Sequence, residues 1–139
     1  MKLFITTVQY GRVQENGTTK AVKEQYLVDA LTFTEAEARI TLEMASSDNG
    51  FEVLDITRPR LHEAFLDSGD AFYKAKVKYV TLDEKTGTEK ATVTTWIVRA
   101  DSFDEAYKTI KNTFQGGVSD GSIVSLVETP IVDFIQTER

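Results

Sequence analysis

The stretch Tyr26–Ile40 reads YLVDALTFTEAEARI, and the stretch Trp96–Ile110, 70 residues later, reads WIVRADSFDEAYKTI. Each copy opens with an aromatic residue and two aliphatic residues, a composition typical of a β-strand. Thr32 and Glu35 have the spacing of a capping box, in which the hydroxyl accepts from the glutamate's amide and the glutamate reaches back to the cap amide. The second copy has serine and glutamate at the same places. The sequence therefore predicts a strand that runs into a capped helix, and it predicts this unit twice.

The similarity between the two halves extends beyond these stretches. Two further pairs of segments match at offsets of 69 and 71 residues: Phe4–Tyr10 with Tyr73–Tyr79, and Val53–Pro59 with Val124–Pro130. Because the offset grows along the chain, we expect one extra residue in the second hairpin loop and another in the second helix-to-strand loop. We interpret the chain as a tandem duplication, with repeat 1 over about residues 1–66 and repeat 2 over about 70–135.

Both predicted helices carry an apolar stripe at steps of three and four residues, which favours one buried face. The stripes are Phe33, Ala36, Ile40 and Met44 in the first helix, and Phe103, Ala106, Ile110 and Phe114 in the second. We expect these side chains to lie against the sheet. The loops 46–50 and 116–121, rich in Gly, Ser, Asp and Asn, are expected to end the helices, because these residues tolerate left-handed backbone.

A proline closes each predicted third strand, and a short segment follows it: Arg60–Phe65 after Pro59, and Ile131–Ile135 after Pro130. Both segments predict either a short fourth strand or a helical turn packed on the other repeat. The predicted fold is α+β: a tandem duplication of a ββαβ or ββαββ unit with pseudo-two-fold symmetry, a mostly antiparallel sheet and two helices on one face. The two sheets either join edge to edge or pack with the helices covering one face. One domain over residues 1–139 is predicted, because each unit alone buries little apolar surface.

The composition is that of a soluble globular chain, with 41% hydrophobic and 27% charged residues among 139. The absence of cysteine excludes disulfides and thiolate metal sites. No signal sequence and no membrane span are evident, so we expect a cytoplasmic protein without a membrane partner. The net charge of −6 argues against a protein coated in nucleic acid. It does not forbid a local basic surface, because charges are screened within about 8 Å at physiological salt.

Three segments carry a resemblance to a known family: Tyr26–Ile40, then VTLDEKTG at Val80–Gly87, then VETPIVDF at Val127–Phe134. Through them the chain resembles a family of domains of unknown function that occurs in Bacteroides-type gut bacteria and their tailed phages. The likeness spans nearly the whole chain. It implies a small cytoplasmic accessory protein of a phage or its host, and it supplies no catalytic residues.

Catalytic chemistry finds little support in the sequence. His62 is the one histidine of the chain, so a second imidazole for a histidine-based metal site is missing. A thiol nucleophile is absent as well, and no G-x-S-x-G elbow precedes a helix. We therefore predict no catalytic residue, no metal and no cofactor, and we expect the protein not to be an enzyme.

Three lysines distinguish the second half from the first. Lys74, Lys76 and Lys78 follow a period of two, which places them on one face of a strand at intervals of roughly 7 Å. Basic side chains combined with aromatic rings are typical of single-strand nucleic-acid binders. The predicted binding residues are Lys74, Lys76, Lys78, Tyr79, Lys90, Trp96 and Arg99. A solvated outer face, or an edge strand protected by its lysines, would explain the same pattern without a ligand.

Two other functions remain open from the sequence. A pseudo-symmetric domain offers a cleft between its halves, which would suit a sponge for a small nucleotide-type ligand or an inhibitor of host defence. Open sheet edges would suit a protein-interaction module that forms a homodimer.

Overall fold

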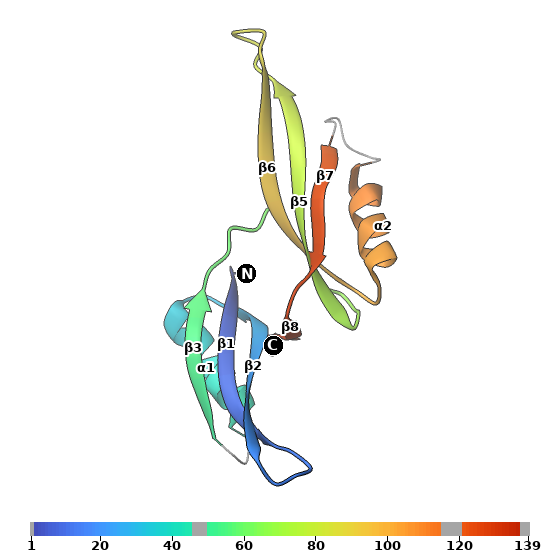
Figure 1. The fold of residues 1–139 in the computed structure, drawn as a ribbon. Helices are drawn as coiled ribbons and strands as arrows, with labels where there is room; N and C mark the ends of the chain where they lie inside the picture. The colour runs from blue at the N-terminus through green and yellow to red at the C-terminus, as the bar shows by residue number, and fades with distance from the viewer. Residues whose placement is uncertain (1, 46–49, 115–120, 137–139) are drawn as a thin grey trace. The chain divides into compact units, whose positions relative to one another are not determined.

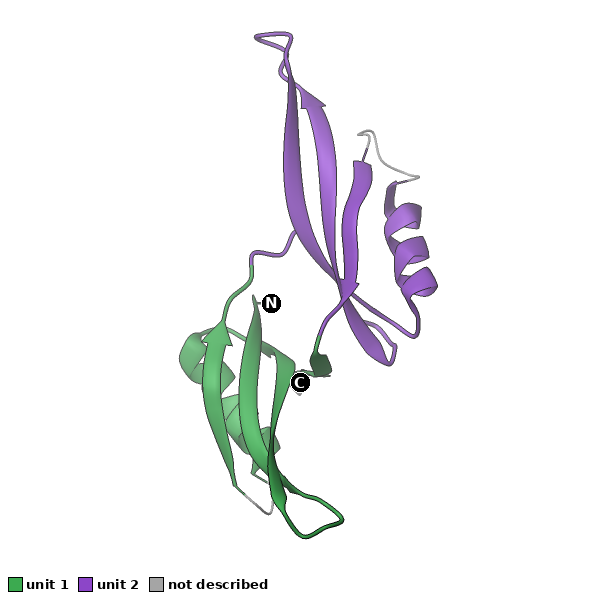
Figure 2. Cartoon of the chain, in the orientation of Figure 1, with its two compact units in different colours: residues 1–59, 130–139 green, residues 60–129 purple. Residues whose placement is uncertain are grey.

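In a computed structural model, the chain folds into two compact units, drawn in two colours in Figure 2. One unit contains residues 1–59 and 130–139, and the other contains residues 60–129. The structure describes residues 2–45, 50–114 and 121–136. The loops expected to end the helices lie mostly outside these ranges; Gly50, which is described, has a positive φ of 73°.

The first unit is a four-stranded sheet with one helix. Its elements are β1 (Lys2–Val13), β2 (Thr19–Ala30), α1 (Phe33–Met44), β3 (Phe51–Thr57) and β8 (Ile131–Ile135). The strand order is β3-β1-β2-β8. β1 runs antiparallel to both β2 and β3, whereas β8 runs parallel to β2.

The second unit has the same kinds of element. They are β4 (Glu63–Phe65), β5 (Ala71–Leu82), β6 (Glu89–Ala100), α2 (Phe103–Phe114) and β7 (Gly121–Glu128). The strand order is β4-β6-β5-β7, with β4 parallel to β6 and the other pairs antiparallel. Figure 1 shows the β5–β6 hairpin extending beyond β7 and α2.

The short segments after Pro59 and Pro130 are strands, which confirms one of the two options for them. β4 follows β3 along the chain but pairs with β6 of the second unit, and β8 follows β7 but pairs with β2 of the first. Proline lacks the N–H that an antiparallel ladder needs, so the chain leaves its sheet at these points. The expectation of one sheet with two helices on one face is wrong, because there are two sheets with one helix each.

Each helix packs its apolar stripe on its own sheet. Ala36, Ile40 and Met44 are buried in the first unit, and Ala106 and Ile110 in the second. The prediction fails at the first position of each stripe, because Phe33 is 53% exposed and Phe103 is 50% exposed. These residues open their helices, and each ring meets an aromatic neighbour edge-on: Phe4 at 4.9 Å from Phe33, and Tyr73 at 6.3 Å from Phe103, between ring centroids.

Both capping boxes are present, but the glutamate side chain of each accepts a different backbone amide from the one expected. Glu35 donates its amide to Thr32 Oγ1 at 3.1 Å, and Glu105 donates its amide to Ser102 Oγ at 3.2 Å. The glutamate side chains accept from the residue before the cap, Leu31 in α1 and Asp101 in α2, rather than from the cap itself. The hydrogen bonds with Arg39 and Leu31 hold the pKa of Glu35 below its usual value.

The strand register shows that one of the two expected extra residues, the one predicted in the second helix-to-strand loop, lies elsewhere. Val53 pairs with Val8, and Ile123 pairs with Val77; further along, Thr57 pairs with Ile5, and Val127 with Lys74. Equivalent positions of β3 and β7 therefore differ by 70 throughout, as the two helices do. The extra residue lies between Val127 and Pro130, so its expected place in the helix-to-strand loop is wrong.

Candidate nucleic-acid interface on the second unit

Lys74, Lys76 and Lys78 form a row on β5, and all three side chains are exposed. They alternate with Tyr73, Ala75 and Val77, which are buried in a core that includes Ala106 and Ile110 of α2. Since successive strand residues point to opposite faces, the row lies on the face of the sheet that α2 does not cover. Alternate residues of a strand are about 7 Å apart. The lysine row thus presents three ammonium groups to solvent from one face of the strand.

The cross-strand neighbours of the lysine row are neutral. On β6 they are Ile97, Thr95 and Val93, and on β7 they are Val127, Ser125 and Ser122. In the described part of the chain, the salt bridge that forms is Arg39–Glu35 in α1, so no carboxylate pairs with the row. An unpaired row of this kind is available to an external anion.

The two aromatic residues expected at the interface lie on the opposite face. Trp96 is fully buried, and its Nε1 donates to Thr94 Oγ1 at 3.0 Å. Its ring lies 5.8 Å from Phe114 and 6.4 Å from Tyr79, between centroids. Tyr79 is partly buried in the same core, and burial, followed by the nearby charge of Glu63, raises the pKa of its hydroxyl. Neither ring is therefore presented beside the lysine row.

The remaining two basic residues also separate. Lys90 is exposed and pairs with Thr81, which shares the parity of Tyr79 and so belongs to the face of the aromatic rings. Arg99 pairs with Phe72 on the face of the lysine row. Its Nε donates to the carbonyl of Gly69 at 2.9 Å, and its guanidinium lies over the Phe72 ring at 5.1 Å. Arg99 therefore has a structural role at one end of the row.

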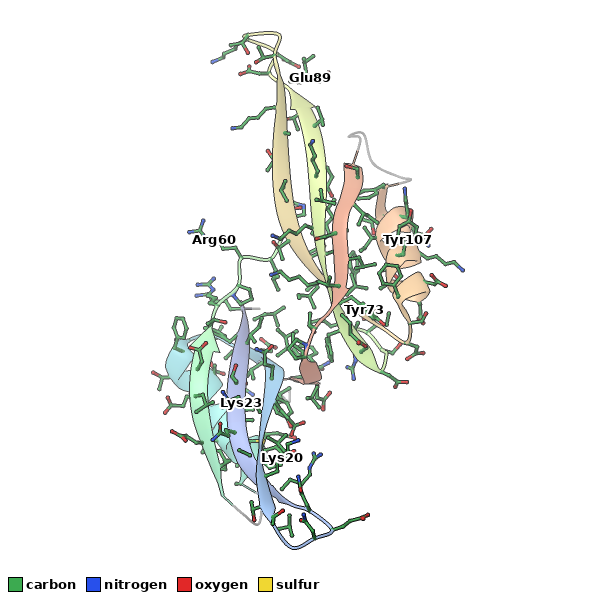
Figure 3. The ribbon with its side chains drawn as sticks, in the orientation of Figure 1. Lys20, Lys23, Arg60, Tyr73, Glu89 and Tyr107 are labelled. Carbon is green, nitrogen blue, oxygen red and sulfur yellow. The ribbon has the colours of Figure 1, made fainter. Side chains whose placement is uncertain are left out.

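The structure thus divides the seven predicted residues by face. Lys74, Lys76, Lys78 and Arg99 share the face that α2 does not cover, on which Phe72 and Ile97 are buried, and Tyr79, Lys90 and Trp96 share the other. Figure 3 shows the side chains of this unit, with Tyr73 marking the strand that bears the row and Glu89 the start of β6. The arrangement can attract phosphate groups but offers no ring on the same face for a base to stack on.

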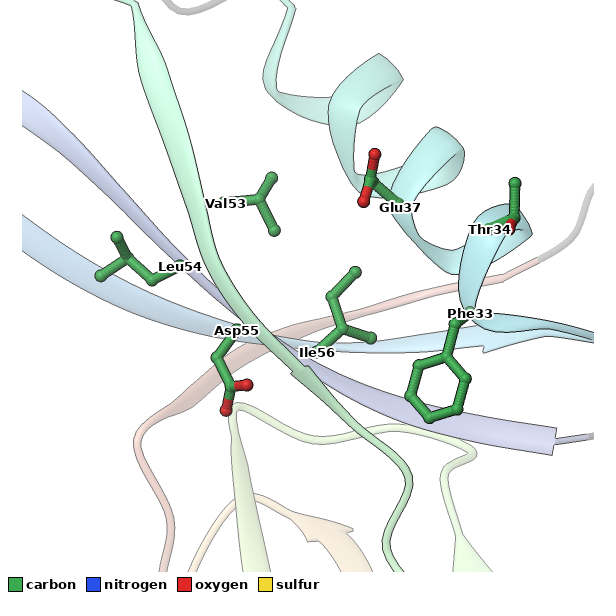
Figure 4. Close-up of a pocket in the computed structure, with 7 residues that line it drawn as sticks. All are labelled: Phe33, Thr34, Glu37, Val53, Leu54, Asp55 and Ile56. Carbon is green, nitrogen blue, oxygen red and sulfur yellow. The ribbon is translucent and has the colours of Figure 1, made fainter.

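The first unit contains an open pocket that could hold a ligand. It has a volume of about 410 Å³ and is lined by Phe33, Thr34, Glu37, Val53, Leu54, Asp55 and Ile56. Figure 4 shows Val53 and Ile56 pointing from β3 toward α1. Two of the lining side chains are carboxylates and none is basic. The pocket is therefore a poor match for the phosphates of a nucleotide.

His62 makes aromatic contacts and one strand-like hydrogen bond. Its ring stacks on Trp96 with centroids 6.0 Å apart, and its amide donates to the Thr95 carbonyl at 2.8 Å. Over residues 2–45, 50–114 and 121–136, no three acidic or histidine side chains gather as a metal site would require. In the same ranges, neither helix has the length and apolar character needed to cross a membrane.

A family model described as a domain of unknown function (DUF4494) matches residues 2–137. The match extends across both units and includes the lysine row. No curated protein and no solved structure matches the chain.

Proposed function

Because the chain belongs to the family described as a domain of unknown function (DUF4494), a description that assigns no activity, we propose a function from its surface. The protein binds single-stranded nucleic acid and catalyses no reaction. Lys74, Lys76 and Lys78 contact successive phosphates along β5. The setting is the cytoplasm of a bacterial or phage-infected cell, in keeping with the family resemblance.

The observation that carries this proposal is the unpaired lysine row. Three adjacent ammonium groups on one face repel one another, and no carboxylate in the described part of the chain offsets that repulsion. The chain has a net charge of −6, so it has enough acidic side chains to supply carboxylate partners for these lysines. The interval of about 7 Å also suits the successive phosphates of an extended strand.

The mode of binding differs from that of aromatic stacking surfaces. With the rings on the other face, affinity depends on charge, and the bases contribute little. For single strands, the slope of log affinity against log salt is about −0.7 for each phosphate neutralised. Three lysines then give a slope of about −2, which weakens binding about 20-fold between about 50 and 200 mM salt.

Fluorescence anisotropy of a labelled oligo-dT strand tests the proposal. The unchanged protein should bind at about 50 mM salt with the slope given above. Lys76→Gln, in the centre of the row, should weaken binding several-fold and make the slope shallower by about 0.7. Lys90→Gln is the matched control, because Lys90 is exposed on the same hairpin but lies on the other face. Absence of binding, or equal losses from the two substitutions, would overturn the proposal.

We also propose that the two units arose by tandem duplication and are related by a pseudo-two-fold axis. The matching strand orders β3-β1-β2-β8 and β7-β5-β6-β4 support this origin. The lysine row then distinguishes the second copy from the first, which has Ile5, Thr7 and Gln9 at the matching positions.

A further inference from the structure

One edge of β6 is without a strand partner over half its length. β6 pairs with β5 from Glu89 to Ala100, but β4 pairs on the other side only at Trp96–Val98. The His62 amide extends this contact by one residue, to the carbonyl of Thr95. In the described part of the chain, no strand pairs with residues 89–94 on that side.

The hydrogen-bonding groups on this edge follow from the register. The amide and carbonyl of a strand residue point to the same side, and successive residues alternate. Because the Thr95 carbonyl points away from β5, the backbone groups of Val93 and Ala91 do so as well. Two amides and two carbonyls, spaced for a β-ladder, are therefore exposed at the edge.

The side chains of this edge do nothing to prevent pairing. Residues 91–95 read ATVTT, a segment without charge, proline or bulge, and Val93 is 56% exposed. β-branched residues favour strand pairing, whereas native edges are commonly protected by charges or bulges. The matching stretch of β2, Ala21–Gln25, reads AVKEQ and carries the charges of Lys23 and Glu24; Figure 3 labels Lys23 there. β3 and β7 each pair through a register shift instead.

We propose that this edge of β6 pairs with the same edge of a second copy of the chain, in antiparallel register about Thr92. Ala91 of each copy then faces Val93 of the other, and the four exposed groups of each edge form four hydrogen bonds in all. Thr92 faces Thr92 of the second copy, and Lys90 faces a threonine. Since no two like charges stand opposite each other, the edge is complementary to itself, as a two-fold interface requires.

The pairing has a consequence for the surface of the dimer. The two-fold axis of such a pair is perpendicular to the joined sheet, so the same face of each copy points the same way. The two lysine rows would then lie on one continuous surface. Dimerisation itself does not depend on nucleic-acid binding and is measured without it.

Cysteine crosslinking tests the register. The chain has no cysteine, so Thr92→Cys introduces the one thiol of each copy. In the proposed register the two Thr92 residues form a non-hydrogen-bonded pair, whose Cα separation of about 4.5 Å is within the range for disulfides. Mild oxidation of dilute protein should convert most molecules of this variant into disulfide-linked dimers. Val22→Cys is the matched control, because Val22 of β2 faces Tyr10 of β1 as Thr92 of β6 faces Tyr79 of β5. Equal crosslinking of the two variants would overturn the proposal.

Sedimentation velocity gives an independent measurement. The unchanged chain should sediment as a dimer. Ala91→Pro removes one outward amide without altering the ladder to β5 or adding charge, so it should sediment as a monomer with unchanged circular dichroism. A monomeric unchanged chain, or a folded Ala91→Pro variant that remains dimeric, would rule out this interface. Neither result bears on oligo-dT binding by the monomer, so this proposal and the function above fail separately.

Discussion

The ring of Phe114 fills the space that a side chain at Gly121 would take: a Cβ there would lie 2.6 Å from the ring's Cε1. Phe114 ends α2 and Gly121 begins β7. At the matching positions of the first unit, Met44 ends α1 and Phe51 begins β3, and both contribute to the core. The first unit thus fills this place between helix and sheet from both elements, and the second fills it from the helix.

This relationship predicts that Gly121→Ala destabilises the protein by about 1–3 kcal/mol, because the added methyl group displaces the Phe114 ring. Phe114→Leu alone should also destabilise the protein, by removing packed ring atoms. Combined, the two substitutions should cost clearly less than their sum, because the smaller residue makes room for the methyl group. Urea unfolding of the two single variants and the double variant measures this coupling. Additive losses would show that the ring and the strand do not compete for the space.

A larger loss is expected at the link between β4 and β5. Gly69 has a φ of 148°, and a Cβ on it would lie 2.5 Å from the backbone of Ala100. Gly69→Ala therefore combines an unfavourable backbone conformation with a clash that no side-chain rotation relieves. We expect a loss of several kcal/mol, or failure to fold. Gly87→Ala is the control: its φ of 70° is unfavourable too, but no atom lies within 4 Å of its Cβ, so only about 1–2 kcal/mol should be lost. Equal losses in thermal unfolding would contradict the clash.

Much of the fold follows from local sequence. The capping boxes set the helix starts, and the spacing of Ala36, Ile40, Ala106 and Ile110 identifies the buried helix faces. What local sequence cannot supply is the partner of a short strand. Glu63–Phe65 and Ile131–Ile135 are too short to carry a pattern that selects one sheet edge over another. Their pairing with β6 and β2 is decided by which edges the longer hairpins leave open.

For the candidate site too, one part follows from local sequence and another part requires the strand register. The alternation Tyr73, Ala75, Val77, Tyr79 is visible in the sequence and already separates Tyr79 from the lysine row. The position of Trp96 requires the register between β5 and β6, in which it faces Ala75. That register depends on a hairpin loop whose length is not set by the strands. The alternation in the sequence therefore predicts that the lysines share one face, as they do in the structure, but it does not assign the Trp96 ring to the other face.

Alkaline pH should weaken the fold. Burial, then the charge of Glu24, raises the pKa of Tyr26, and burial likewise raises the pKa of Tyr79. Above pH 10 the unfolded chain loses these phenolic protons while the folded chain retains them, so unfolding becomes more favourable as pH rises. Tyr79→Phe removes one such group and should make the fall in stability above pH 10 shallower. Urea midpoints between pH 8 and 11 measure the slope; an unchanged slope would contradict a buried phenol at this position.

Trp96 supplies a direct test of how nucleic acid binds, because it is the one tryptophan of the chain and lies on the face opposite the lysine row. Its emission should be that of a buried indole and should stay constant while oligo-dT saturates the protein by anisotropy. Trp96→Phe should cost about 1–3 kcal/mol of stability, since it empties part of the core and removes the hydrogen bond to Thr94. At a temperature where the variant is folded, its affinity for oligo-dT should equal that of the unchanged protein, whereas Lys76→Gln should be weaker. If emission were quenched on binding, or if Trp96→Phe lost more affinity than Lys76→Gln, the strand would lie on the aromatic face. The lysine row would then be a solvated surface and no more.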